Sequence, residues 1–359
     1  MKKLDWYIVR KFLGTFFFMI AAFCVVAVVF DVSENVEDLV NSEAPLSAII
    51  LDYYVNFCLS FGNLLSSFII FLTIILFTSR LAQNTEIVAM LSGGVSFWRI
   101  LRPYLIASGF LVTISLVLAH FILPIANQNK VDFEFTYTKP DYRISEHDMY
   151  REIGDDQIAY FRQITAERKV GYKFALEQWR DGRLTSKLTA SKAKFIEQDS
   201  IWRLTDGRIR SIYEDGTESI RLFSELDSTI DMVIADFGRR KEIVSTLGYQ
   251  ELKSYILEEE SKGSGDVAML EIELHSRTSN AFAIFVLTII GMSIASRKVR
   301  GGTGVHLFLA VLVGFTYVFC QKITTVAATN VGMPAWIAVW IPNILFLILG
   351  IVIYIRAPK

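Results

Sequence analysis

Six long apolar runs constrain this 359-residue chain more than any other feature of its sequence. They lie at about residues 12–30, 59–77, 104–123, 280–295, 305–326 and 335–355. A helix of about 20 apolar residues is long enough to cross the hydrocarbon core of a bilayer. The mean hydropathy of +0.40 is also too high for an ordinary soluble protein. The sequence therefore predicts six transmembrane helices.

The charges between the apolar runs predict how the chain is oriented. With six spans, the N-terminus, residues 78–103, residues 296–304 and the C-terminus lie on one side. These segments carry 12 Lys and Arg against two acids, Asp5 and Glu86. Residues 31–56, after the first run, hold six acids and no Lys or Arg. Because short basic segments stay in the cytoplasm, we expect both termini inside and the long polar region between the third and fourth runs outside.

That polar region has the pattern of a β domain. Short β-favouring runs lie at 157–165, 172–179, 187–196, 200–204 and 208–213. The pairs Asp181-Gly182, Asp206-Gly207 and Asp215-Gly216 predict turns between them. Regular short strands of this kind are typical of a sandwich or jelly roll, and a helix is expected to follow at 249–260.

These observations predict an α-helical membrane protein with six transmembrane helices and an inserted extracytoplasmic β domain, which is either a sandwich or a jelly roll. We expect residues 1–124 to form helices one to three, residues 125–265 the β domain, and residues 266–359 helices four to six. A short cytoplasmic helix is expected at about 84–93.

The short helix has its own start and stop signals. Asn84 and Thr85 can cap its start, and Glu86 in the first turn suits the helix dipole. Gly93-Gly94 predicts its end. An apolar face at helical spacing favours either a groove on a partner protein or the membrane headgroups, and the residues alone do not decide between them.

Enzyme chemistry has no support in the sequence. Gly301-Gly302-Thr303-Gly304 lacks the lysine of a phosphate-binding loop, and no HExxH, CxxC or GxSxG motif occurs. The four histidines are scattered, so we expect no metal site. The three cysteines predict no disulfide framework. Carboxylate pairs in the polar region are expected to lie on solvated faces.

The sequence resembles the LptF/LptG family, the lipopolysaccharide export permeases, over essentially its whole length. Residues 7–10 (YIVR) resemble the start of the family's first span, and residues 86–90 (EIVAM) with Gly93 resemble its cytoplasmic coupling helix, although Thr85 stands where serine is usual. Residues 190–195 with 202–204 resemble a strand pair of the family's β-jellyroll. Residues 341–343 (IPN) resemble its last helix, and residues 314–321 are closer to the LptG branch.

This resemblance implies that the inserted extracytoplasmic domain is a β-jellyroll domain, and it also implies an assembly and a location. Family members pair with a second permease subunit, so this chain would form a heterodimer or a homodimer, and they sit on a cytoplasmic ATPase dimer that binds the ATP. They lie in the bacterial inner membrane and pass lipopolysaccharide to a periplasmic bridge protein with a jellyroll fold. The resemblance implies that this chain binds no cofactor itself. It also implies that the helix at 84–93 docks on the ATPase through Glu86, Ile87, Met90, Leu91 and Gly93. Glu86 either faces a basic partner or acts only as a capping carboxylate.

Substrate contacts are harder to place. Lys322 is the only Lys or Arg that lies within the predicted spans and well away from the inner face. It either snorkels to the interface or contacts substrate, and Phe315 and Phe319 are candidates beside it. The family carries lysines just outside the first span, where this chain has Asp31, Glu34, Glu37 and Asp38. Divalent ions could bridge these acids to phosphate, or the headgroup could carry little charge.

Two other function classes stay open at this point. A permease that acts on lipoproteins or the cell wall usually has four spans rather than six. A membrane sensor with an external β domain would need a cytoplasmic output domain, and the largest inner segment here has only about 26 residues.

Overall fold

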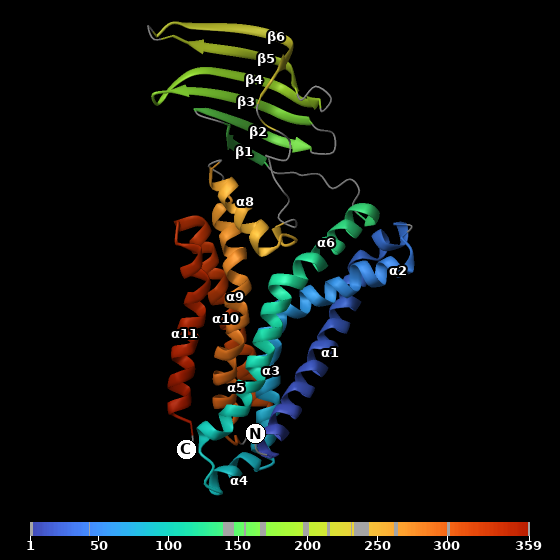
Figure 1. The fold of residues 1–359 in the computed structure, drawn as a ribbon, viewed down its shortest axis with the longest axis vertical. Coiled ribbons are helices and arrows are strands. Elements are labelled where there is room, and N and C mark those ends of the chain that lie inside the picture. The colour runs from blue at the N-terminus through green and yellow to red at the C-terminus, as the bar shows by residue number, and fades with distance from the viewer. Residues whose placement is uncertain are drawn as a thin grey trace. The chain divides into compact units, whose positions relative to one another are not determined.

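The structure is a computed structural model. It describes residues 3–42, 44–138, 147–153, 156–165, 170–196, 201–213, 216–230, 232, 244–261, 265–299 and 302–357. The chain divides into a helical unit (Met1–Thr138, Ser245–Leu252 and Ala268–Lys359) and a β unit (Lys139–Val244 and Lys253–Val267) (Figure 1). Three residues named in the sequence analysis lie outside the described residues. They are Ser200 of a predicted strand, Asp215 of a predicted turn, and Gly301 of the glycine-rich segment 301–304.

Six helical segments of the described chain are long and apolar enough to cross a membrane, which confirms the predicted spans. They are α1 (Lys3–Asn41), Leu46–Gln83, Phe97–Thr138, α9 (Val267–Ala295), α10 (Gly302–Val331) and α11 (Ala335–Ile355). The second segment comprises α2 (Leu46–Ala48), the π-helical η1 (Ile49–Tyr54) and α3 (Val55–Gln83). The third comprises α5 (Phe97–Val117), the π-helical η2 (Leu118–Ile122), α6 (Leu123–Phe133) and the π-helical η3 (Glu134–Thr138).

The acidic segment after the first apolar run is largely helical, although the predicted first span ends at residue 30. Helix α1 continues through it to Asn41, and the next helix starts after Pro45. No Gly or Pro occurs between residues 31 and 44, so nothing in the backbone ends the helix earlier. Asn35 alone departs from helical geometry, with φ −107° and ψ 15°, and marks a kink.

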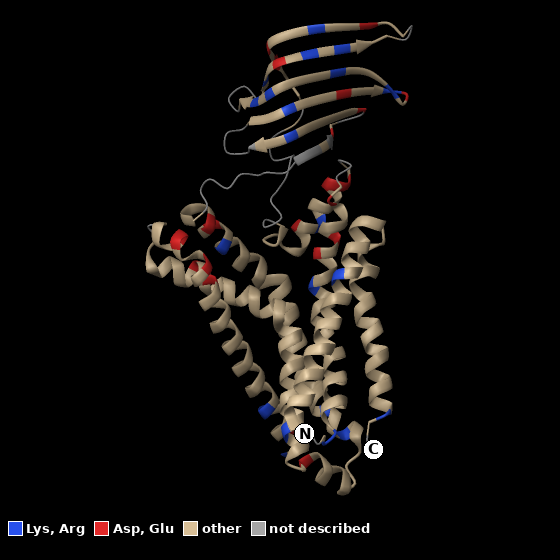
Figure 2. Ribbon diagram, turned by 180° about the vertical axis from the view of Figure 1, so that it is seen from behind, with Lys and Arg blue, Asp and Glu red and all other residues tan. Residues whose placement is uncertain are grey.

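Charge is segregated along the helical unit. Figure 2 shows Lys and Arg gathered at the end that carries both chain termini, whereas Asp and Glu gather around the opposite ends of the helices. The short helix α4 (Glu86–Ser92) lies at the basic end, between α3 and α5. This separation is the pattern that the positive-inside rule describes.

The helical unit is held together by apolar packing with a few buried polar contacts. Phe12, Ile70 and Tyr104 are fully buried in one cluster. The Tyr104 hydroxyl accepts a hydrogen bond from Thr78 Oγ1 at 3.0 Å. Gly291 permits close helix packing, since a Cβ there would lie 3.1 Å from atoms of Phe71 and Ile74.

The β unit contains one six-stranded antiparallel sheet in chain order. Its strands are β1 (His147–Glu152), β2 (Gln157–Thr165), β3 (Val170–Arg180), β4 (Arg183–Ile196), β5 (Ile201–Ile212) and β6 (Glu218–Ser228). The inserted β domain is therefore confirmed. Its described strands form a meander, because each strand pairs with the next one along the chain. Phe161, Phe174 and Trp202 form the centre of its core.

One predicted turn is a strand interior instead. Asp181-Gly182, with φ of 49° and 73°, joins β3 to β4 as predicted. Asp206-Gly207, by contrast, lies inside β5, where Asp206 has φ 51° and Gly207 pairs with Ala190 and Phe223 on the two neighbouring strands. The predicted turn is therefore wrong at this position, and β5 keeps its register with both neighbouring strands through Gly207. Helix α8 (Tyr249–Ser261) follows the sheet, close to its predicted bounds.

Candidate functional site

The start of α4 lacks the side-chain cap that its sequence predicts. Thr85 precedes the helix in the left-handed region, at φ 60°, and its side chain makes no capping hydrogen bond. Its hydroxyl donates instead to the Asn84 carbonyl at 2.6 Å. The left-handed backbone turns α4 away from the end of α3, which leaves α4 as a separate short helix.

Gly94 ends the helix. The Gly94 amide donates to the Leu91 carbonyl and the Val95 amide donates to the Met90 carbonyl, both at 3.0 Å. This pair of hydrogen bonds is a Schellman motif, and it requires a left-handed residue after the last turn. Gly94 meets this need with φ 80°, whereas Gly93 has an ordinary φ of −77°.

The two faces of α4 have different surroundings. Ile87 is 1% exposed and packs in the apolar core of the helical unit, and Met90 and Leu91 pack partly buried against the same core. The opposite face consists of Val88, which is 48% exposed, with exposed Ala89 and Ser92. Of the residues predicted for docking, Ile87, Met90 and Leu91 thus fix α4 to the bundle, while Gly93 is exposed.

Glu86 is tied to the first helix. Tyr7 donates a hydrogen bond from its hydroxyl to Glu86 Oε2 at 3.2 Å, and Asn84 Nδ2 donates to Glu86 Oε1 at 3.4 Å. Lys11 Nζ in turn donates to the Tyr7 hydroxyl at 2.6 Å. Glu86 is therefore part of a contact between α1 and α4, and it remains partly exposed to solvent.

A second polar contact joins α1 to the start of α5. Arg99 Nη1 and Nη2 donate to the two Asp5 carboxylate oxygens at 2.6 and 2.8 Å. The Ser96 hydroxyl caps α5 by accepting from the Arg99 amide at 3.3 Å. The sequence prediction missed this pair, although Asp5 is one of only two acids in the basic segments and was the available signal.

The predicted substrate residues of helix α10 lie on a different face of the helix from its buried residues. Phe315 and Phe319 are each 66% exposed, and Lys322 is exposed on the same helix. Tyr317 faces the opposite way and is buried, and its hydroxyl donates to Asn343 Oδ1 at 2.8 Å. Asn343, from the proline-containing motif of α11, donates to Ser279 of α9 at 2.9 Å. Tyr317 therefore has a structural role, whereas the other three form an outward face.

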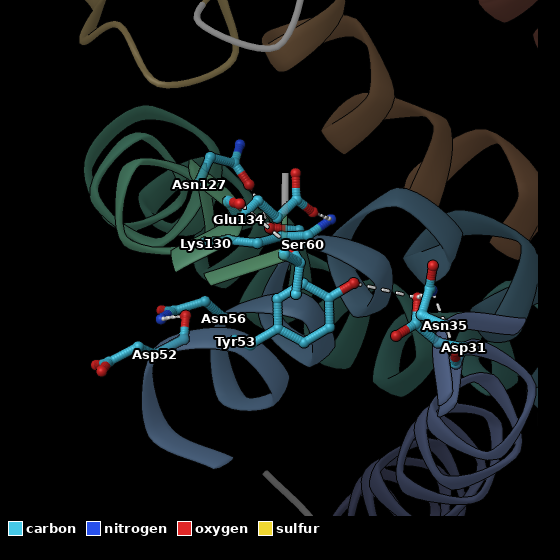
Figure 3. Close-up of polar contacts among 10 residues, drawn as sticks. Asp31, Asn35, Asp52, Tyr53, Asn56, Ser60, Asn127, Lys130 and Glu134 are labelled. Carbon is cyan, nitrogen blue, oxygen red and sulfur yellow. Dashed lines mark hydrogen bonds and ion pairs between the residues drawn. The ribbon is translucent and has the colours of Figure 1, made fainter. Parts of the chain in front are cut away.

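The acidic ends of the helices hold a polar cluster, drawn in Figure 3. Asp31 Oδ1 accepts hydrogen bonds from the Tyr53 hydroxyl and from Asn35 Nδ2, both at 3.3 Å. Lys130 Nζ lies 3.6 Å from Glu134 Oε1 and 5.5 Å from the ring centre of Tyr53. Lys130 thus lies beside a carboxylate and two aromatic rings, which partly compensate its charge.

Lys130 also lines a cavity of about 410 Å³ among α3, α6 and α9. Phe57 and Phe61 of α3, whose rings stack at 5.6 Å, form part of its wall. Arg277 lines the wall on α9, where its Nε donates to Glu273 at 3.1 Å and its Nη1 donates to the Leu247 carbonyl at 2.9 Å. Lys130 and Arg277 fell outside the predicted spans, because those spans ended where the apolar runs ended.

A second cavity, of about 500 Å³, lies among α1, α3 and α5. Its lining is almost entirely apolar, with Ile20, Leu59, Leu111 and Leu118 among its residues. The cavity lies within the apolar section of the helices, so its shape and chemistry suit an acyl chain.

The chain matches one family model over residues 6–356, and that model is described as "Lipopolysaccharide export system permease LptF/LptG". The match begins at the first helix and ends after the last, so it includes the inserted β unit. No protein with a curated description matches the chain.

Proposed function

The chain belongs to the LptF/LptG family of lipopolysaccharide export permeases, and from this membership we propose that it is the permease subunit of an ATP-driven export complex. The complex would contain a second permease subunit of this family, a cytoplasmic ATPase dimer and a periplasmic bridge protein with a jellyroll fold. Its task is to extract lipopolysaccharide from the inner membrane and to pass it to the bridge. The match across residues 6–356 carries this proposal.

We propose that both termini and α4 face the cytoplasm and that the β unit lies in the periplasm. The segregation of basic and acidic residues along the helical unit supports this orientation (Figure 2). Lipopolysaccharide would then leave from the leaflet nearest the acidic helix ends.

The energy would come from a separate chain. The sequence contains no phosphate-binding loop, and this chain would bind no nucleotide or other cofactor. The exposed face of α4, formed by Val88, Ala89 and Ser92, would enter a groove of the ATPase. Ile87 on the buried face would transmit force, because it is packed in the core of the helical unit. Gly93 and the partly exposed Glu86 border this surface.

The substrate would meet two surfaces of the helical unit. Phe315 and Phe319 on α10 offer an apolar face to acyl chains, with Lys322 toward an anionic group. Lys130 offers a second cation at the acidic end, beside the aromatic wall of the 410 Å³ cavity. The acids of residues 31–56 would by themselves repel a phosphate group. Lys130 would place a positive charge near them and so reduce this repulsion.

Purification and reconstitution test the function directly. The chain, purified in mild detergent, should bring down an ATPase and a second permease subunit or a second copy of itself. In vesicles, lipopolysaccharide should reach a soluble jellyroll acceptor only with ATP and not with a non-hydrolysable analogue. Release that is independent of ATP, or a preparation that lacks any ATPase, would contradict the proposal.

A further inference from the structure

A groove of about 700 Å³ runs along the N-terminal part of α1, on the side away from the Asp5–Arg99 contact. Four basic residues line it: Lys3, Arg10 and Lys11 from α1, and Arg80 from α3. Trp6 lies among them and is 60% exposed. The groove belongs to neither the docking face of α4 nor the proposed substrate surfaces.

The positive charge in the groove is largely uncompensated. No carboxylate lines it. The two nearby acids are engaged elsewhere, since Asp5 pairs with Arg99 and Glu86 accepts from the Tyr7 hydroxyl. Within the described residues, the side chains of Lys3, Arg10 and Arg80 form no hydrogen bond or ion pair. An anion could therefore bind to these cations without displacing a carboxylate from them.

The groove also has an apolar end. Its lining continues past the cations to Gly14, Thr15 and Phe18, within the first apolar run. From Lys3 to Phe18 the helix rises about 22 Å. A Cβ built on Gly14 would meet nothing within 4 Å, so this glycine leaves the floor open. A molecule with an anionic head and an apolar tail matches both ends.

We propose that this groove binds an anionic glycerophospholipid of the cytoplasmic leaflet, with its phosphate among Lys3, Arg10 and Arg80 and its acyl chain over Gly14. Basic pockets at the cytoplasmic side of membrane helices bind such headgroups, and tryptophan favours the same depth. The assignment to the inner leaflet rests on the orientation proposed above. If these cations served only to orient the chain in the membrane, that role would explain their number. It would not explain the open apolar floor that lies beneath them.

Bound lipid would lie next to the docking helix. Lys11 lines the groove and contacts Tyr7, and Tyr7 donates to Glu86 on α4. A phosphate that attracts Lys11 would weaken the Lys11–Tyr7 contact. The lipid is thus placed to influence how α4 is held.

Native mass spectrometry of the full chain in neutral detergent tests the site, with phosphatidylglycerol and phosphatidylcholine of identical acyl chains as probes. We expect phosphatidylglycerol to bind at least about tenfold more tightly. The double substitution Arg10→Gln and Arg80→Gln should weaken that binding roughly 20- to 30-fold, since each cation near an anionic headgroup contributes about fivefold. Gly14→Leu should also weaken it, because it fills the floor while keeping every charge. The matched control, Arg102→Gln with Lys298→Gln, removes two exposed cations outside the groove and should change binding by less than about twofold.

Several results would overturn the proposal. They are equal binding of the two lipids, equal losses in the groove and control variants, and full binding by Gly14→Leu. Displacement of phosphatidylglycerol by lipid A would make the groove a substrate site instead, and loss of lipid binding when a second copy associates would make it a protein interface. The outcome is separate from that of the proposed function, because lipid selectivity in detergent requires neither ATP nor transport.

Discussion

Arg99 at the start of α5 donates two parallel hydrogen bonds to Asp5 near the start of α1, and the Asp5 side chain is only 7% exposed. A bidentate guanidinium–carboxylate pair of this kind fixes both the distance and the angle between the two side chains. It therefore sets how the first and third spans meet at the basic end of the helical unit.

Removal of Asp5 should destabilise the helical unit. We expect Asp5→Ala to cost about 1–3 kcal/mol, because Arg99 would keep its charge at a partly buried site without its acceptor. Thermal unfolding in detergent measures the effect. Asp227→Ala is the control, since it removes the partner of Arg203 in a pair that is about 42–45% exposed, and it should lower the unfolding temperature much less, because an exposed ion pair contributes little to stability. Equal effects would show that the Asp5 contact is no more than a surface pair.

The Asp5–Arg99 pair also shows what the sequence could not predict. Its members are 94 residues apart, and nothing local indicates that they meet. The spans themselves were predictable, because apolar length alone specifies a membrane helix. Their polar extensions were missed because residues 31–41 are mostly polar and acidic, although the segment has apolar residues at helical spacing (Val32, Val36, Leu39 and Val40) and no Gly or Pro interrupts it.

The β unit also shows which features depend on local backbone preference and which depend on pairing between distant strands. Asp181-Gly182 forms its turn from local backbone preference alone. Asp206-Gly207 has a similar local preference, yet the pairing of β5 with β4 and β6 keeps it within a strand. In α4, spacing predicted an apolar face, but packing decided that Ile87 faces the bundle and Val88 faces solvent.

Gly207 should be indispensable to the sheet. A Cβ at this position would lie 2.3 Å from the Phe223 ring and 2.3 Å from the Thr189 carbonyl oxygen. Gly207→Ala should therefore destabilise the sheet by about 1–3 kcal/mol, as overpacking does, and increase the rate of proteolysis within β4–β6. Gly265→Ala is the control, because a Cβ there meets nothing within 4 Å. Unchanged proteolysis of Gly207→Ala would mean that both the Phe223 ring and the backbone at Thr189 shift at little cost.

Topology follows from the charge distribution and is directly measurable. A reporter enzyme inserted after Gly216 should be active in the periplasm, and reporters after Gly94 or Gly302 should be active in the cytoplasm. All three positions have positive φ and open or nearly open surroundings, so insertion should be tolerated. A cytoplasmic signal at Gly216 would reverse the orientation and remove the basis of the transport proposal.

Docking of α4 should depend on its exposed face and on Glu86. Val88→Asp should abolish co-purification of the ATPase without loss of stability, because Val88 is exposed. Ile87→Ala should instead cost about 2–5 kcal/mol of stability, as for other buried aliphatic truncations.

Two further variants define the role of Glu86. Glu86→Lys should lose the ATPase, since one charge-assisted contact is worth about 2–3 kcal/mol. Tyr7→Phe removes the hydrogen bond from α1 to Glu86 and also the one that Lys11 donates to the Tyr7 hydroxyl, and it should retain the ATPase. If Tyr7→Phe matches Glu86→Lys, then Glu86 acts by holding α4 to α1 rather than by meeting a partner.

Headgroup recognition should depend on cations and not on the acids of α1. Glu34, Glu37 and Asp38 are exposed along the helical extension, and Asp31 already accepts from Tyr53 and Asn35. Among the described residues, no three acids, histidines or cysteines converge as a metal site would require. We predict that Lys130 and Lys322, rather than a divalent ion held by these acids, contact the phosphate.

Neutralising Asp31, Glu34, Glu37 and Asp38 together should accordingly leave transport in reconstituted vesicles unchanged, with or without a chelator. Lys130→Gln and Lys322→Ala should each slow it, by roughly five- to tenfold if one cation near phosphate is worth about 1 kcal/mol or slightly more. Lys253→Gln, in α8, is the control for the loss of a cation outside both surfaces. A loss in the acid-neutralised protein equal to that caused by chelating the unaltered protein would establish ion bridging and refute the cation-based account. Unchanged transport by both lysine variants would refute it as well, because acyl-chain contacts would then suffice.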